Sequence, residues 1–211
     1  MFFSFDGVDG VGKTTQLNLF CQWLRSRGLD VVCCRDPGST RLGERLRQIV
    51  LGDAETAIHR RSEMLLYMAA RAQLVEEVIR PALESAKTVV SDRYLLANVV
   101  YQGHAGGLDV QQVWQIGEIA TAGTRPTLTF LLDMSPEAAC RRIQRGLDRM
   151  ESQGADYLRR VREGFLTEAG RRPEEIVVID AGRDIDCIQA DIRSAAELVL
   201  SREPITGELS R

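Results

Sequence analysis

The sequence predicts an α/β fold built on a five-stranded parallel sheet with helices on both faces. Short β-rich runs alternate with longer amphipathic stretches along the chain, and most of the short runs are continuously apolar. A strand that is covered on both faces has such a run, whereas a strand with one solvated face alternates apolar and polar residues. The regular alternation of strand and helix patterns is typical of a doubly wound parallel sheet.

Each element of this fold has its own local pattern. The expected strands span residues 2–6, 30–35, 88–92, 127–133 and 176–180. The expected helices span residues 16–27, 42–51, 61–84, 110–122, 136–145 and 187–200. Ser135-Pro136 is typical of a helix start, and Pro81 is expected to kink or divide the long third helix. We expect one domain over residues 1–211, with a loose polar tail from about residue 202.

Composition limits the class of partner. The chain has 211 residues and a formal net charge of -3, which argues against a general binder of nucleic acid or anionic membranes. No apolar run approaches the roughly 20 residues of a membrane span, and the first residues lack the features of a signal peptide. Five scattered cysteines and two histidines indicate reduced thiols in a cytoplasmic protein, and neither a zinc site nor a disulfide framework.

A glycine-rich segment follows the first expected strand directly. Residues 7–14, GVDGVGKT, match the pattern G-x-x-x-x-G-K-[ST] in full. Glycine permits the positive φ angles with which backbone N–H groups curl around an anion, and a helix N-terminus adds its dipole. The segment therefore predicts a site for a nucleoside triphosphate, and a plain glycine-rich turn is the alternative. Lys13 is expected to reach the β- and γ-phosphates, and the Thr14 hydroxyl to bind Mg²⁺.

Other polar residues end neighbouring strands at the same edge of the sheet. Asp92 closes the third expected strand, which suits a direct or water-mediated contact to Mg²⁺, and a buried ion pair with Arg93 is the alternative. Residues 35–40, RDPGST, follow the second strand and on their own indicate only a turn. Tyr67 and Arg71 are four residues apart on one helix face, where packing is the alternative to ligand binding.

The ordered set GVDGVGKTT, RDPGST, YMAAR (67–71), DRY (92–94) and YQG (101–103) resembles the thymidylate kinase family. The motifs cover most of the chain, from residue 2 to about 182. The resemblance implies the P-loop kinase fold, transfer of the γ-phosphoryl group of ATP to dTMP in dTTP biosynthesis, Mg²⁺ as cofactor and a cytoplasmic homodimer. Its ATP-binding residues would be Gly7, Val8, Asp9, Gly10, Val11, Gly12, Lys13, Thr14 and Thr15, with Thr14 and Asp92 on the metal.

The resemblance also implies roles on the acceptor side. Asp9 would engage the sugar 3′-hydroxyl, Arg93 would clamp the dTMP phosphate, Tyr67 would stack on thymine and Arg71 would hydrogen-bond the base. The remaining expected substrate-binding residues are Asp36 and Pro37 on the floor of the site, Asn98 at the base edge, Tyr101 at the sugar 2′ position, and Gln102. Tyr67 stands where the family commonly has phenylalanine, and we expect the glycine-rich residues 102–107 to be mobile.

A lid is expected at about residues 142–156. Arg142, Arg145 and Arg149 are spaced three and four apart, so a helix would place them on one face, and a solvated basic face is the alternative. The family resemblance implies a catalytic arginine either in the lid or just after the P-loop acid, and this chain has Gly10 at the second position. The expected catalytic set is Lys13, Arg93, Asp9, Arg142, Arg145 and Arg149.

Three alternatives to a thymidylate kinase stay open at this point. The first is a related kinase that acts on dUMP or on a deoxynucleoside, because thymine and uracil differ by one methyl group, worth only about 1–3 kcal/mol. The second is a P-loop ATPase or regulatory switch without a small acceptor. The third is an inactive nucleotide-binding homologue, which the retained Lys13, Thr14, Asp92 and Arg93 disfavour.

Overall fold

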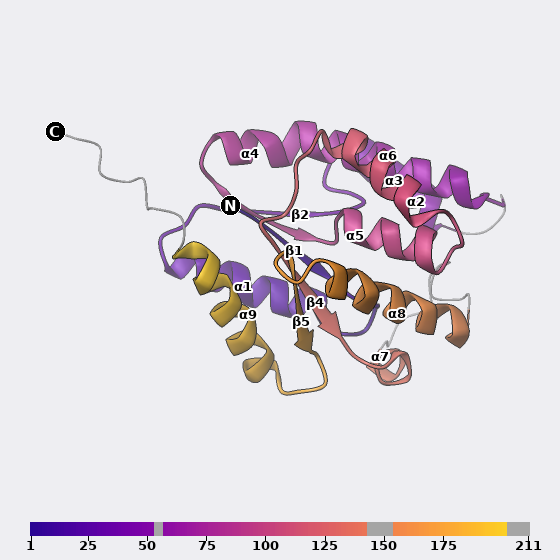
Figure 1. Cartoon of the computed structure of the whole chain (residues 1–211). Helices are drawn as coiled ribbons and strands as arrows, with labels where there is room; N and C mark the ends of the chain where they lie inside the picture. Colours follow the sequence, from indigo (N-terminus) through magenta and orange to yellow (C-terminus); the bar gives the residue numbers. More distant parts are fainter. Residues whose placement is uncertain (53–56, 143–153, 202–211) are drawn as a thin grey trace.

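The computed structural model describes residues 1–52, 57–142 and 154–201. Its strands are β1 (Phe2–Asp6), β2 (Val31–Arg35), β3 (Thr88–Asp92), β4 (Leu128–Asp133) and β5 (Ile176–Asp180). They form one sheet in the order β2-β3-β1-β4-β5, and all neighbours are parallel. The predicted five-stranded parallel sheet is therefore confirmed (Figure 1).

Strand β1 lies at the centre of the sheet and is buried on both faces. Phe3 and Phe5 contact Phe20 of helix α1 (Lys13–Ser26), with ring centroids 5.2 and 5.7 Å apart. On the opposite face Phe2 meets Tyr94 edge to face at 4.9 Å. This two-sided packing is the physical reason for the continuous apolar run in the sequence.

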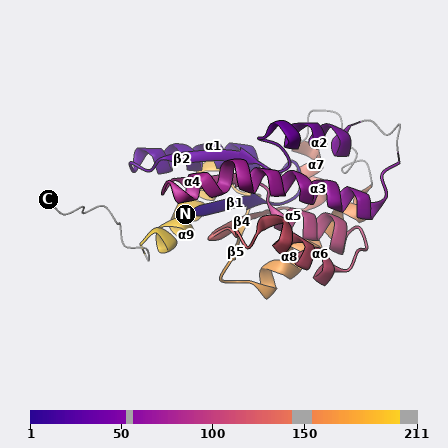
Figure 2. The same cartoon turned by 90° about the horizontal axis from the view of Figure 1, so that it is seen from above.

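Helices cover both faces of the sheet. In Figure 1, α1 and α9 (Ile185–Leu200) lie below the sheet, and α3 (Arg60–Leu74), α4 (Arg80–Glu84) and α6 (Val110–Thr121) run above it. Figure 2 shows α2 (Arg41–Leu51) and α7 (Pro136–Arg142) at the end of the molecule opposite to the N-terminus. This is the end where the parallel strands finish, so the loops that follow β1, β2 and β3 meet there.

The long third helix is divided as predicted. One turn of π-helix, η1 (Val75–Ile79), separates α3 from α4, and Pro81 stands at the start of α4. Proline has no backbone N–H to donate to the preceding turn, so a locally widened turn lets the helix continue past it.

Within the described part of the chain, three elements were absent from the sequence-based prediction. They are α5 (Leu95–Asn98), the π-helix η2 (Val99–His104) and α8 (Ala155–Arg171). Residues 102–107 were expected to be mobile. This expectation was wrong for Gln102 and Gly103, which are buried in η2. Gly106 follows in close contact with this turn: a Cβ there would lie 2.6 Å from the Gln102 carbonyl oxygen. A glycine is therefore present at this position because the backbone is closely packed, and not because the segment must be flexible.

The ends of other predicted elements fall outside the described residues. Helix α7 is described as far as Arg142, so the predicted continuation to residue 145 is not covered. Most of the expected lid and the expected tail from residue 202 also lie outside the described ranges. Within those ranges, no helix is long and apolar enough to cross a membrane.

Candidate active site

The P-loop, residues 7–15, joins the buried strand β1 to helix α1. Gly7, Gly10 and Gly12 all have positive φ angles, of 134°, 88° and 92°. At Gly7 a Cβ would lie only 2.4 Å from the carbonyl oxygen of Leu132 in β4, so the loop passes against the sheet edge at a distance that only glycine allows. The chain thus turns tightly enough to present backbone N–H groups at the start of α1.

Lys13 is buried inside this loop. Its ammonium donates to the carbonyl oxygens of Gly7 and Val8 at 3.1 and 2.9 Å, and to the Asp9 carboxylate at 3.2 Å. Burial and the Arg93 charge lower the pKa of Lys13, whereas the Asp9 carboxylate opposes the shift. The ammonium is therefore a pre-positioned donor at the mouth of the loop, where the P-loop motif requires a contact to phosphate.

Arg93 joins the P-loop to the pocket beside it. Its guanidinium donates to the Gly7 carbonyl at 3.1 Å, to Asp9 Oδ1 at 2.8 Å and to the Tyr101 hydroxyl at 3.4 Å. Burial alone would raise the pKa of Asp9, but Arg93 and Lys13 together hold it well below its usual range. Arg93 has a φ of 67°, a conformation that is strained for a residue with a side chain and that is concentrated at functional sites.

Thr14 and Asp92 lie together beside the loop. The Thr14 hydroxyl donates to Asp92 Oδ2 at 3.4 Å, and both residues line the same cleft. A hydroxyl and a carboxylate oxygen are hard ligands of the kind that Mg²⁺ prefers, and Mg²⁺ commonly takes its other ligands from phosphate and water. This donor pair therefore fits Mg²⁺, although no group of three or more His, Cys, Asp or Glu residues suited to a metal occurs among the residues described.

Two concavities meet at the carboxyl end of the sheet. The first, here named the P-loop cleft, has a volume of about 800 Å³ and lies over residues 9–16, Asp92 and the start of α9. The second, here named the inner pocket, opens between α3, α5 and η2. Its lining residues are Asp9, Asp36, Pro37, Arg47, Leu51, Tyr67, Arg71, Arg93, Ala97, Asn98, Tyr101 and Gln102. All nine residues that were expected to bind the acceptor are in this list.

A chain of buried polar side chains forms one wall of the inner pocket. Arg71 Nε donates to Asp36 Oδ2 at 2.6 Å, and Arg71 Nη1 donates to Asn98 Oδ1 at 3.0 Å. Asn98 Nδ2 donates to Gln102 Oε1 at 2.6 Å, and Gln102 Nε2 donates to Glu63 Oε1 at 2.8 Å. Asp36 stands next to the cis peptide bond with Pro37, and burial raises its pKa while the Arg71 guanidinium opposes the shift.

Several residues at this end of the sheet were missed by the sequence-based prediction. Arg47 lines both cavities and donates to the Pro37 carbonyl oxygen at 3.1 Å. Asp6, the last residue of β1, is fully buried, and within the described ranges neither of its carboxylate oxygens has a hydrogen-bond partner. Burial raises the pKa of Asp6 to about 7, against the opposing charges of Arg93 and Lys13. Strand-end position was the available signal for Asp6, as it was for Asp92.

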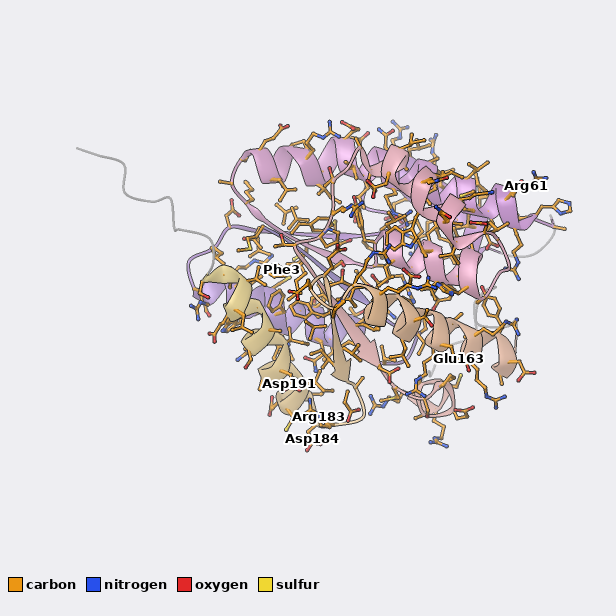
Figure 3. All side chains as sticks on the ribbon, viewed as in Figure 1. Phe3, Arg61, Glu163, Arg183, Asp184 and Asp191 are labelled. Carbon is orange, nitrogen blue, oxygen red and sulfur yellow. The ribbon has the colours of Figure 1, made fainter. Side chains whose placement is uncertain are left out.

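The expected lid arginines are covered only in part. Arg142 is the last described residue of α7; it donates to the Ala181 carbonyl oxygen at 3.1 Å and lines the P-loop cleft, whereas Arg145 and Arg149 lie outside the described residues. Arg183 and Asp184 line the same cleft, and Figure 3 shows them together at the beginning of α9. Arginine side chains thus reach the cleft from α7 and from the loop before α9.

The phosphate loop and its buried lysine define a P-loop nucleotide-binding protein, and the inner pocket adjoins the loop. Comparisons with known proteins agree with this class. The family model "Thymidylate kinase" matches residues 5–192. The thymidylate kinase of Rhodopirellula baltica is 46% identical over 193 residues, which cover 92% of this chain and 78% of that protein.

Two further relatives support the same family. The thymidylate kinase of Symbiobacterium thermophilum is 44% identical over 203 residues and covers 96% of this chain and 95% of its own length. The crystal structure of thymidylate kinase from Ehrlichia chaffeensis superimposes with a TM-score of 0.78 at 26% identity, over 93% of this chain and 98% of that one. The chain belongs to the thymidylate kinase family, and it is therefore an ATP-dependent nucleotide kinase.

Proposed function

We propose that this chain transfers the γ-phosphoryl group of ATP to dTMP, with ATP in the P-loop cleft and dTMP in the inner pocket. The observation that carries the proposal is the shared wall of the two cavities. Asp9, Asp36, Arg47 and Arg93 line both of them. Two phosphate groups bound from opposite sides would therefore meet at the Arg93 guanidinium, which is the arrangement that direct transfer between nucleotides requires.

The charged residues at the junction act by positioning and neutralisation. A nucleoside monophosphate has a second pKa near ~6, so its attacking oxygen is already largely anionic at neutral pH and needs no general base. Arg93 holds the acceptor phosphate, and Asp9, ionised between Arg93 and Lys13, is free to orient the sugar 3′-hydroxyl. Lys13 stabilises charge on the transferring group, together with Arg142 and the expected Arg145 and Arg149.

Thr14 and Asp92 hold Mg²⁺ in this proposal. A cation held there would neutralise charge on the phosphate groups of ATP. The Thr14 hydroxyl supplies a neutral oxygen ligand, and Asp92 binds the cation directly or through water. Because the two side chains come from α1 and β3, a cation held by them would lie at the end of the sheet.

The inner pocket suits a 2′-deoxy pyrimidine nucleotide. Tyr67 offers a ring for stacking on the base, and Arg71 and Asn98 offer a donor and an acceptor at its edge. The Tyr101 ring, over which the Arg93 guanidinium lies at 5.2 Å, is buried and fills the space beside the proposed sugar site. Slower turnover of dUMP is compatible with the same groups, since one methyl group sets the difference.

We further propose that the enzyme is a cytoplasmic homodimer. Leu65 of α3 and Ile119 of α6 are large apolar side chains that are 52% and 82% exposed on neighbouring helices. A second copy that packs on these helices would bury them. Light scattering should give the mass of two chains, and the mass of one chain would reject the dimer.

A coupled ADP-release assay tests the proposed reaction. The purified protein is supplied with Mg-ATP and, separately, dTMP, dUMP, dCMP, dAMP, dGMP, thymidine and no acceptor. ADP release is expected with dTMP, more slowly with dUMP, and at background without acceptor. Lys13→Ala serves as the inactive control for contaminating kinases. Equal ADP release with and without dTMP would favour an ATPase, and turnover of thymidine alone would favour a nucleoside kinase.

A further inference from the structure

Glu63 is a buried carboxylate at the inner end of the polar chain described above, and the proposed reaction gives it no role. Its side chain is 0% exposed and accepts a hydrogen bond from Gln102 Nε2 at 2.8 Å. Arg60, one turn earlier on α3, lies 3.6 Å away and is partly exposed. Burying a carboxylate is costly unless it is paired and hydrogen-bonded, so a polar function should accompany it.

The part of the polar chain from Arg71 to Glu63 begins and ends on α3. Glu63 and Arg71 are eight residues apart, about two helical turns, and therefore lie on the same face. The two amides between them, Asn98 and Gln102, come from α5 and η2 on the opposite side of the pocket. This part of the chain thus joins α3 to α5 and η2 through groups that are all buried.

The chemistry of the two ends fixes the orientation of both amides. A guanidinium only donates hydrogen bonds and a carboxylate only accepts them, whereas a side-chain amide does both. With Arg71 at one end, Asn98 must turn its oxygen toward Arg71. With Glu63 at the other end, Gln102 must turn its nitrogen toward Glu63. Any reversal of the chain would place donor against donor at Arg71 and acceptor against acceptor at Glu63.

This orientation determines what the pocket presents to a base. Asn98 Oδ1 accepts from Arg71 Nη1 at 3.0 Å and keeps a second lone pair, whereas Arg71 Nη2 donates one N–H to the Tyr94 carbonyl oxygen at 3.3 Å and keeps the other. An acceptor and a donor therefore stand side by side at the wall of the inner pocket. A 4-oxo pyrimidine presents the matching pair, an acceptor O4 and a donor N3–H. Cytosine presents the opposite pair, a donor 4-amino group and an acceptor N3. Both of its groups would face groups of the same kind.

We propose that Glu63 is a positioning residue that sets base selectivity, because its buried carboxylate, through Gln102, locks the Asn98 amide in the orientation that accepts a 4-oxo pyrimidine and rejects cytosine. The inference rests on the proposed function, since it concerns the base of the dTMP substrate. It assigns Glu63 no contact with the substrate. Its effect passes through two hydrogen bonds, at 2.8 and 2.6 Å, to the amide that lines the pocket.

The variant Glu63→Gln replaces the acceptor-only carboxylate at this end of the chain by an amide and leaves the shape of the side chain unchanged. A glutamine can donate to Gln102 as well as accept from it, so the reversed chain would then be opposed only at Arg71. Relative to wild type, the ratio of kcat/KM for dTMP to that for dCMP should fall tenfold or more. Because Arg71 still opposes the reversed chain, kcat and KM for dTMP should both stay within about twofold, and the ratio should fall through a rise of kcat/KM for dCMP.

A second variant is designed to fix the orientation of the Asn98 amide again, with the carboxylate at a different position. In the double variant Glu63→Gln/Gln102→Glu, the carboxylate moves one position along the chain and accepts directly from Asn98 Nδ2. Asn98 is then held again between a donor-only and an acceptor-only neighbour, and the dTMP:dCMP ratio should return to within about threefold of wild type. Glu168→Gln is the matched control. Glu168 of α8 is an equally buried carboxylate that accepts from His104 and Trp114, and it does not line the inner pocket.

The experiment measures kcat and KM for dTMP and dCMP in wild type and the three variants, with thermal unfolding as a check of folding. A fall of the ratio in Glu63→Gln, its return in the double variant and no change in Glu168→Gln would support the proposal. An unchanged ratio in folded Glu63→Gln, or a double variant that stays unselective, would overturn it. If Glu63→Gln fails to fold, the ratio in the double variant decides. Absence of dTMP turnover by the wild type would refute the proposed function instead.

Discussion

Asp6 offers a direct thermodynamic test of how the active site is built. This carboxyl group is 0% exposed at the end of β1, and in the described part of the chain neither oxygen has a hydrogen-bond partner. Burial raises its pKa from 3.8 to about 7, although Arg93 and Lys13 act in the opposite direction. Ionisation of a buried carboxyl group that has no hydrogen-bond partner should make the folded protein less stable. The Asp6→Asn variant cannot ionise at this position and should not show this loss of stability.

The magnitude follows from the shift. A folded-state pKa above the unfolded-state pKa means that the folded protein binds more protons between these values, so stability falls as pH rises through this window. A change from 3.8 to about 7 corresponds to about 4 kcal/mol in total, and roughly 2–3 kcal/mol of it falls between about pH 5 and pH 8. Wild type should therefore lose this much stability relative to Asp6→Asn over that interval.

Urea unfolding of both proteins without nucleotide, at several pH values from about 5 to 8, measures the difference. Other titrating groups cancel when the free energies of unfolding are subtracted, because the two chains differ at one position. The account predicts that the stability of Asp6→Asn relative to wild type rises with pH by roughly 2–3 kcal/mol. A difference that is independent of pH would show that Asp6 is ionised throughout, and the description of an unpartnered carboxyl would then be wrong.

Three further predictions follow from the described contacts. Lys13→Ala should lower kcat by about 10²–10³-fold while dTMP binding, measured by calorimetry, changes little; an equal loss in dTMP affinity would place Lys13 on the acceptor instead. Tyr101→Ala should weaken discrimination between dTMP and its ribonucleotide counterpart, and unchanged discrimination would remove its role at the sugar. Cys33 is exposed. Its hydrogen bond with Cys21 and, to a smaller extent, the charge of Arg25 lower the pKa of the Cys33 thiol to about 6. Its alkylation rate, compared with Cys33→Ser as blank, should therefore reach half its maximum near pH 6, and a midpoint above pH 8 would contradict this environment.

The features that the sequence predicted are those that a short, contiguous stretch of residues determines. The P-loop is a contiguous pattern after an apolar run, and the parallel arrangement brings the carboxyl ends of β1, β2 and β3 to one edge whatever the details of packing. The nine expected acceptor-site residues follow from that edge and from the family resemblance, and they meet in one pocket.

The parts that the sequence did not predict depend on partners far along the chain. Glu63 and Gln102 are separated by 39 positions, and nothing near either residue indicates the hydrogen bond between them. Burial of Asp6 depends on the neighbouring strands β3 and β4. The π-helix η2 contains a glycine, Gly103, a residue typical of loops, and packing against α6 and α8 decides its conformation instead.

Direct transfer of the γ-phosphoryl group from ATP to dTMP is tested most directly by following that group with a label. Wild-type protein is incubated with ATP labelled in its γ-phosphate, unlabelled dTMP and Mg²⁺, and the products are separated by chromatography. Label is expected to leave ATP only as the β-phosphate of dTDP, with one labelled dTDP formed for each ADP. Label recovered as inorganic phosphate in the presence of dTMP would contradict direct transfer between the two cavities.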